Sequence, residues 1–141
     1  MTINPVLIKS SYAAIEAHGS EVTAHFYRHL FEHHPAVRPL FAEHLDEQQD
    51  RLWAAIGALV THLEDTETLV GVLEGLGRRH AGYGALPAHF PAVGGSLLAT
   101  LAHFAGDAWT PETEESWTAV YGVVTDVMGR ALTAELATGS A

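Results

Sequence analysis

The chain has 141 residues, 48% of them hydrophobic and none of them cysteine, so disulfides, thiolate metal sites and thiol catalysis are excluded. Its 17 acidic and 7 basic side chains give a formal net charge of −10, which argues against nucleic acid or an anionic membrane as a partner. This length suits one domain over residues 1–141. The N-terminal MTINPVLIKS lacks the regions of a signal peptide, and no apolar run reaches the roughly 18 residues of a membrane span, so we expect a cytoplasmic protein.

Hydrophobic periodicity and helix-end signals predict helices along nearly the whole chain. The first helix is expected from about Asn4, with Pro5 in its first turn, to His18, where Gly19 stops it. The other helices are expected over about 20–34, 45–63, 66–80, 87–105 and 110–137, with a short turn over 36–41. Val, Ile and Thr do not cluster in strand-like alternation. The predicted fold is all-α, and periodicity alone does not separate a helix bundle from a globin-like arrangement.

The segment LGRRHAGYG, residues 76–84, places a histidine at the end of an apolar helical stripe. Leu69, Leu73 and Leu76 recur on one helix face, and His80 follows Leu76 by four residues on that same face. A basic last turn followed by glycine is also typical of an ordinary helix end, and satisfied core histidines are common. Two interpretations therefore remain open at this position, a structural histidine and a ligand.

Two more polar side chains fall on apolar helix faces. Gln48 lies four residues before Leu52, on the stripe that continues through Ile56. Tyr27 lies on the second helix, which carries two apolar stripes side by side and is expected to be buried on a wide front. An edge glutamine or a core tyrosine would explain each residue singly. Together with His80, however, they are typical of a mainly apolar pocket with few polar groups, as cofactor sites are.

Four segments resemble bacterial haemoglobins and the globin domain of flavohaemoglobins. FYRHLFEHHPAVRPLF, residues 26–41, resembles their second helix and the corner after it, and LGRRHAGYG resembles the segment of their proximal histidine. HFPAVGGSLLATL, from His89, and ESWTAVYGVVTDV, from Glu115, resemble their last two helices. The resemblance runs from about residue 4 to 132 in the family's order. It implies a globin fold, with three helices over three around a haem.

The resemblance also implies roles for individual residues. His80 would be the axial ligand of a haem b, with its second ring nitrogen donating to a backbone carbonyl, expected to be that of Leu76. Tyr27 and Gln48 would form the polar pair on the opposite, distal side, where O2, NO or CO binds. The remaining residues implied to contact the haem are Phe41, Leu52, Arg79, Phe90, Val93, Val124 and Met128. We expect tight oxygen binding and slow release.

Two features differ from flavohaemoglobins. A tyrosine and a glutamate that hydrogen-bond with the proximal histidine in that family align here with Phe90 and Leu132. We therefore expect less electron donation from His80 and feeble peroxidase-type activity. The chain also has no glycine-rich dinucleotide loop, so we expect no reductase domain, and reduction of the iron by NADH would need a separate flavin reductase.

Three functions remain as alternatives. The first is reversible oxygen binding for storage or delivery, by a monomer or homodimer. The second is nitric oxide dioxygenation supported by a separate reductase, for which Tyr27 is equally suited. The third is a non-haem metal protein, because His25, His29 and His33 are spaced four residues apart, as in chelating sites for zinc or nickel. For that histidine stripe we favour an exposed, solvated helix face.

Overall fold

The computed structural model describes residues 3–139. Within that range the chain forms α-helices and short 3-10 helices and no strand, as the sequence predicts. The α-helices are α1 (Pro5–Glu16), α2 (Ser20–His33), α3 (Asp46–Thr61), α4 (Thr66–Gly82), α5 (Phe90–Ala105) and α6 (Pro111–Gly139). The 3-10 helices are η1 (Pro35–Leu40), η2 (Pro87–His89) and η3 (Gly106–Ala108).

Local chemistry sets several of the helix ends. Asn4 caps α1, because its side-chain oxygen accepts a hydrogen bond from the backbone nitrogen of Val6 at 3.0 Å. Asp65 caps α4 in the same way, accepting from the backbone nitrogen of Thr68 at 3.3 Å. Gly19 separates α1 from α2 with a φ of +49°, a conformation that residues with a side chain rarely adopt.

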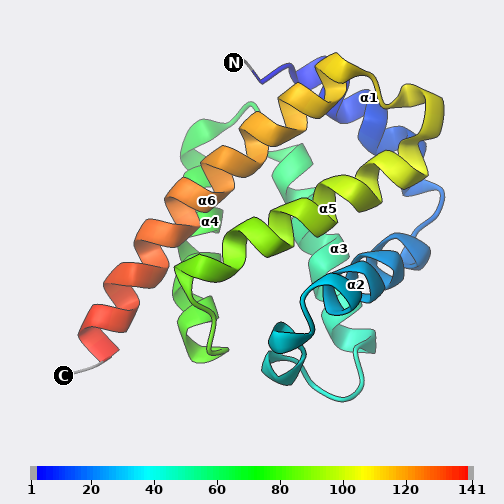
Figure 1. The fold of residues 1–141 in the computed structure, drawn as a ribbon. Helices are drawn as coiled ribbons and strands as arrows, with labels where there is room; N and C mark the ends of the chain where they lie inside the picture. The colour runs from blue at the N-terminus through cyan, green and yellow to red at the C-terminus, as the bar shows by residue number, and fades with distance from the viewer. Residues whose placement is uncertain (1–2, 140–141) are drawn as a thin grey trace.

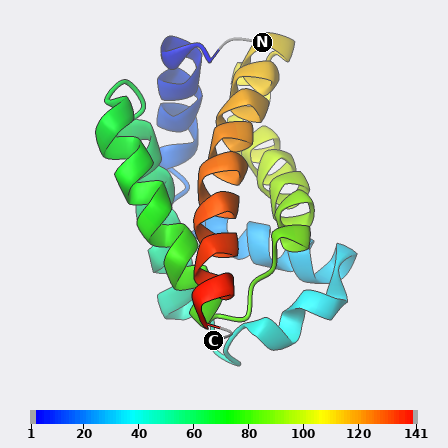
Figure 2. The same ribbon diagram turned by 90° about the vertical axis from the view of Figure 1, so that its left-hand side faces the viewer.

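The helices lie in two layers. Figure 1 shows α2, α5 and α6 in front of α1, α3 and α4, and Figure 2 shows α6 running along α4 in the turned view. The layers are joined by contacts of α4 with α6, of α2 with α3, and of α1 with α5 and α6. One of these contacts is a buried hydrogen bond, in which Nε1 of Trp117 donates to Oγ of Ser11 at 2.8 Å. The three-over-three arrangement of the globin fold is thus confirmed.

Two clusters of buried side chains position the candidate site. The aromatic cluster lies between α2, η1, α3 and α5, and the aliphatic cluster lies between α4, α5 and α6. Buried members of the aromatic cluster are Phe26, Tyr27, Leu30 and Val37, with Phe31, Phe41, Leu52 and Val93 packed against them. Buried members of the aliphatic cluster are Leu69, Leu73, Phe90, Val127, Met128 and Leu132, with Leu76 and Val124 packed against them.

Some helix boundaries differ from the sequence prediction. The helix α4 continues to Gly82 instead of ending near residue 80, so His80 lies within its last turn. The expected fifth helix divides into η2 over 87–89 and α5 from Phe90 onward. The helix α3 runs from Asp46 to Thr61, slightly shorter at both ends than expected. These shifts concern fraying ends, where pattern reasoning is least reliable.

Among residues 3–139, no single helix is long and apolar enough to cross a membrane. The helix α4 and the segment Pro87–Ala108 would together be long and apolar enough, but the chain bends by 108° between them.

Candidate functional site

The ring of His80 is oriented by a carbonyl of its own helix. Its Nδ1 lies 2.6 Å from the carbonyl oxygen of Leu76. Because a carbonyl can only accept a hydrogen bond, Nδ1 carries the proton and Nε2 keeps a lone pair. The half-buried ring is met edge-on by Tyr83, with 5.3 Å between ring centroids, and its Nε2 has no hydrogen-bond partner among residues 3–139. This is the orientation that a histidine ligand of a metal adopts.

The chain turns sharply just after this histidine. Tyr83 is still in a right-handed helical conformation, and Gly84 adopts a φ of +80°. Gly82 is the last helical residue of α4. A Cβ on Gly84 would lie 3.4 Å from Cδ2 of Leu40, so the corner after α2 and the α4–α5 connection meet here. Glycine is therefore favoured at residue 84 by backbone conformation and by space.

Tyr27 lies inside the aromatic cluster with only 3% of its surface exposed. Its ring contacts those of Phe26, Phe31 and Phe41 at centroid distances of 4.9, 5.8 and 5.5 Å. Burial raises the pKa of the Tyr27 hydroxyl, and the side chain of Gln48 opposes the rise with a hydrogen bond. The hydroxyl therefore stays protonated at neutral pH and remains a donor. The structure brings together the two polar residues predicted for one side of the site.

Arg38 organises the corner that follows α2, a role that sequence reasoning missed. Its guanidinium donates to the carbonyl oxygens of Phe41, Ala42 and Glu43 at 3.2, 3.0 and 3.1 Å. It also lies over the ring of Phe31, 4.9 Å from the centroid. These contacts fix the chain at Phe41. The available signal was an arginine in a corner between two prolines, where backbone carbonyls lack helical partners.

The other residues predicted to line a cofactor fall into the two clusters. Phe41, Leu52 and Val93 belong with Tyr27 to the aromatic cluster. Phe90, Val124 and Met128 belong to the aliphatic cluster between α4, α5 and α6. Arg79 is exposed, and its Nη1 lies 3.7 Å from where a Cβ on Gly75 would be. Its side chain thus runs back along its own helix, and the structure shows no anion partner for it among residues 3–139.

Comparisons with known proteins agree with this arrangement. A model of the globin family matches residues 24–128. The chain belongs to the globin family. A flavohemoprotein of Chromobacterium violaceum is 32% identical over 125 residues, which are 86% of this chain and 31% of that protein. The chain thus spans about a third of the length of the curated relatives that it matches.

Two solved structures share the fold at lower identity. A bacterial globin from Campylobacter jejuni is 23% identical, with a TM-score of 0.80 over 92% of this chain and 94% of that one. An engineered carbene transferase from Rhodothermus marinus is 22% identical, with a TM-score of 0.88 over 99% of this chain and all of that one.

Membership of the globin family implies a haem cofactor, and the residues of this globin fit one. The proton on Nδ1 of His80 leaves Nε2 as the free ligand atom. Aromatic and aliphatic side chains of both clusters would supply the apolar walls that a porphyrin needs. Tyr27 and Gln48 supply the few polar groups. The fit therefore rests on the donor set and on the orientation of one imidazole.

The two residues that the resemblance aligned with a hydrogen-bonding tyrosine and glutamate are both apolar in this globin. Phe90 and Leu132 both lie in the aliphatic cluster, 9% and 0% exposed. Neither side chain carries a hydrogen-bonding group. Glu135, a few residues further along α6, is exposed. The hydrogen bond to the Leu76 carbonyl is therefore the one that orients the His80 ring.

Tyr121 fastens the start of α5 to α6, a second role that sequence reasoning missed. Its hydroxyl donates to the carbonyl oxygen of Phe90 at 2.7 Å. A Cβ on Gly94 would lie 2.5 Å from the Tyr121 ring, so glycine leaves room for it. Burial raises the pKa of Tyr121 to about 12, against a weaker opposing hydrogen bond with Thr125. A glycine in the first turns of an apolar helix, such as Gly94, indicates that another element packs closely there, but the sequence does not indicate which one.

The histidine stripe of α2 is partly covered by α5, and its three histidines do not converge on a metal site. His25 and His29 are half-buried against α5, where their Nδ1 atoms hydrogen-bond to hydroxyls of Thr100 and Ser96. The Nδ1 of His33 hydrogen-bonds to the carbonyl of His29. In the part of the chain that the structure describes, no three His, Cys, Asp or Glu side chains are arranged to hold a metal ion. The expectation of a solvated face is wrong for His25 and His29, because they pack against a helix remote in sequence, whereas His33 is exposed as expected.

Proposed function

We propose that this globin binds haem b through Nε2 of His80 and holds dioxygen reversibly beside Tyr27 and Gln48, with NO and CO as further ligands. When bound, the haem supplies an iron at which a diatomic gas binds reversibly. The observation that carries the proposal is the pairing of the buried phenol of Tyr27, within the aromatic cluster, with the half-buried amide of Gln48. A buried hydroxyl needs a hydrogen-bonding partner, and the side chain of Gln48 provides one for Tyr27.

The residues on the Tyr27 side act through hydrogen bonds. A protonated phenol donates to a ligand that carries partial negative charge, and the amide of Gln48 is a second donor. Each such bond contributes about 1 kcal/mol, more where water is excluded. The rings of Phe26, Phe31 and Phe41 fix the Tyr27 side chain, so little entropy is lost when it donates. Slow ligand release follows.

The residues on the His80 side mainly anchor the cofactor. A backbone carbonyl is a weaker acceptor than a carboxylate, so the Nδ1 proton remains on the ring and the imidazole donates little charge. This supports ligand binding without bond cleavage, and we expect peroxidase-type activity to be feeble.

Titration with haem tests the proposal. The wild-type chain should bind about one equivalent and show a Soret band that shifts reversibly with oxygen, whereas His80→Gly should lose at least about tenfold in haem affinity. Added imidazole should restore the spectrum of the His80→Gly variant, and His62→Asn serves as a control at a histidine outside the site. A wild-type chain without a Soret band after reconstitution would contradict the proposal.

Nitric oxide dioxygenation is the second candidate function. The Rhodothermus marinus neighbour is described as a candidate nitric oxide dioxygenase, and curated relatives are flavohemoproteins about three times as long as the aligned region. For this chain the reaction would require electrons from a separate flavin reductase. Consumption of NO driven by NADH and a generic flavin reductase, at a rate well above that of the reductase alone, would favour this function over simple oxygen binding.

A further inference from the structure

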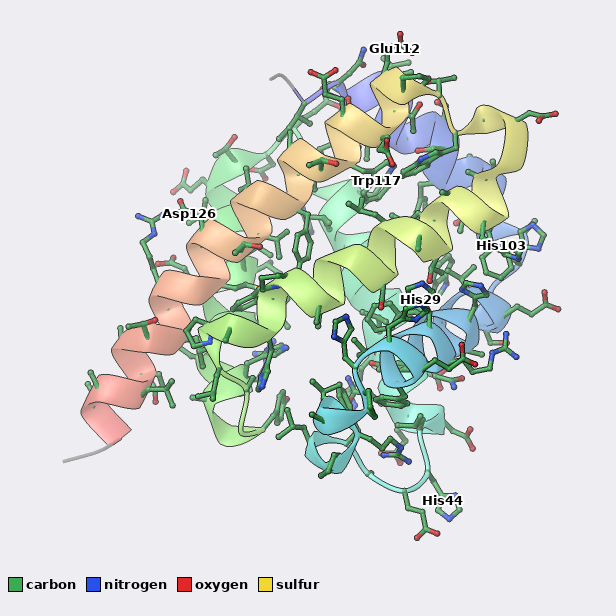
Figure 3. All side chains as sticks on the ribbon, in the orientation of Figure 1. His29, His44, His103, Glu112, Trp117 and Asp126 are labelled. Atoms are coloured by element: carbon green, nitrogen blue, oxygen red, sulfur yellow. The ribbon has the colours of Figure 1, made fainter. Side chains whose placement is uncertain are left out.

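Two histidines of α2 hydrogen-bond to two hydroxyls buried in α5. The Nδ1 of His25 lies 3.1 Å from Oγ1 of Thr100, and the Nδ1 of His29 lies 2.8 Å from Oγ of Ser96. Thr100 is 0% and Ser96 is 1% exposed, so these hydroxyls are sealed from water. Both pairs are spaced four residues apart on their helices, so the two bonds are successive rungs between α2 and α5. Figure 3 shows His29 where α2 faces α5.

The rings of these histidines stack on two further imidazoles. His103 of α5 lies on His25 at a centroid distance of 4.6 Å and an interplanar angle of 13°. His33 lies on His29 at 4.0 Å and 17°, and His25 and His29 are 6.3 Å apart. We call His25, His29, His33 and His103, with Ser96 and Thr100, the histidine ladder. Rings this close repel one another once two neighbours are charged.

The groups around the ladder favour its neutral form. Those that act on His25 or His29 are His103 from α5, Arg28, Glu32 and His33 from α2, and His34 just after α2. In the turn after α1, His18 contacts the Phe104 ring, which in turn meets His25 edge-on. Glu32 is the one carboxylate in this set. A positive charge on the ladder is therefore surrounded mainly by arginine and histidine side chains, which disfavour protonation.

Burial lowers the pKa of both His25 and His29, and the neighbouring histidines lower it further against the opposing charge of Glu32. A histidine whose pKa is lowered in the fold binds fewer protons than in the unfolded chain. The packing it supports is therefore fully present above the ordinary histidine pKa of 6.5, and it weakens as the pH falls below that value.

We infer that the histidine ladder is a proton-sensitive latch, in which neutral rings hold α2 against α5 and protonated rings loosen α2 and speed the release of oxygen. Tyr27 lies on α2 between the two rungs, so a movement of this helix displaces the phenol from its aromatic cluster. The loosening of α2 stands on the ladder alone, whereas its effect on oxygen rests on the proposed function. A proton taken up by His25 or His29 thus weakens the hydrogen bond from the Tyr27 hydroxyl to bound oxygen, on the other face of α2.

Amide hydrogen exchange on the haem-loaded chain tests the latch. Between about pH 8 and about pH 5.5, after correction for intrinsic exchange, amides of α2 should lose protection by roughly threefold or more, while amides of α4 serve as the internal reference. The oxygen dissociation rate of the same sample should rise by roughly two- to tenfold over that range.

A double variant, His25→Asn with His29→Asn, provides the decisive comparison. Asparagine places an amide nitrogen near the position of Nδ1, so it can bond to the hydroxyls of α5 without titrating. Both pH effects should fall to less than half of the wild-type size in this variant. They should persist in His44→Asn, because His44 is exposed on the loop before α3 and points away from the helices (Figure 3).

Three outcomes would overturn the inference. The first is an equal pH effect on α2 protection in the wild type and in the double variant. The second is loss of α2 protection with an oxygen dissociation rate that stays constant with pH, provided that Tyr27→Phe does change that rate. If Tyr27→Phe leaves it unchanged, the proposed function fails and the latch is judged on exchange alone. The third, which does not depend on a variant that folds, is a wild-type NMR titration in which His25 and His29 take up protons at or above the ordinary pKa of histidine.

Discussion

The Tyr27 side of the candidate site and the His80 side hold their polar groups in different ways. Tyr27 is surrounded by aromatic rings and bonded by the side chain of Gln48, so two side chains are available as donors. His80 lies at the end of a stripe that continues into aliphatic packing, and its orienting partner is the carbonyl of Leu76. Substitution of Tyr27 or Gln48 removes a donor from the first side, whereas the carbonyl that orients His80 remains whatever side chain residue 76 carries. We propose that the Tyr27 side controls how long a gas ligand stays bound, and that the His80 side controls whether the haem stays bound.

Removal of packing on the His80 side is expected to have the largest effect on stability. Leu132→Ala should lower the free energy of unfolding by about 3 kcal/mol, because a side chain that is 0% exposed leaves a cavity. The iron–histidine stretching frequency of the haem-loaded protein should stay at its wild-type value, well below that of peroxidases, because Leu132 offers His80 no hydrogen bond. Urea unfolding and resonance Raman spectra measure the two quantities. A frequency in the peroxidase range in the wild type would mean that His80 has a stronger acceptor than the Leu76 carbonyl.

Loss of the Arg38 contacts at the corner after α2 should lower stability and loosen the packing around Tyr27. Arg38→Met removes the donors to the carbonyls of Phe41, Ala42 and Glu43, and it should cost about 1–2 kcal/mol of unfolding free energy. Because Phe41 packs on Tyr27, oxygen should also leave faster. Arg130→Met is the matched control, since its ion pair with Asp126 is exposed and should contribute little. Equal stability of the two variants would show that Arg38 does not hold the corner.

Tyr121→Phe is expected to have a smaller effect, of about 1 kcal/mol, because it removes one hydrogen bond and preserves the ring against Gly94. The pKa of Tyr121 is raised from 10.0 to about 12, so the unfolded chain loses this proton first as the pH rises. The neutral phenol therefore stabilises the fold below about pH 10, and that contribution is lost between about pH 10 and about pH 12. Alkaline unfolding curves of the wild type and the variant should converge in this range. Curves that remain parallel up to pH 12 would contradict the role of the buried hydroxyl.

Features that depend on spacing within one helix were predictable from the sequence. Helical periodicity placed His80 behind Leu76 on one face, and the hydrogen bond between them is observed. The resemblance to bacterial haemoglobins paired Tyr27 with Gln48, and the fold brings the two together. Short-range rules suffice for His80, because residues four apart share a helix face whatever the tertiary structure, whereas the pairing of Tyr27 with Gln48 joins two helices and came from the resemblance alone.

Features that depend on contacts between distant segments were not predictable in this way. His29 and Ser96 are 67 residues apart in the chain, so the pattern on α2 alone suggested a solvated stripe or a chelate. The contact of Tyr121 with Gly94 and the bonds of Arg38 were missed for related reasons, since one needs the packing of α5 on α6 and the other needs the path of an irregular corner. Helix ends also shifted by a few residues, as fraying makes them weakly specified.

The oxygen dissociation rate of Tyr27→Phe, measured on the haem-loaded protein beside Gln48→Leu and the wild type, tests the central claim most directly. The phenylalanine keeps the ring in the aromatic cluster and removes only the donor. We predict a rise of roughly tenfold, equivalent to about 1.4 kcal/mol, for Tyr27→Phe and a smaller rise for Gln48→Leu. A dissociation rate of Tyr27→Phe that equals the wild-type rate would contradict the conclusion that the Tyr27 side holds the ligand.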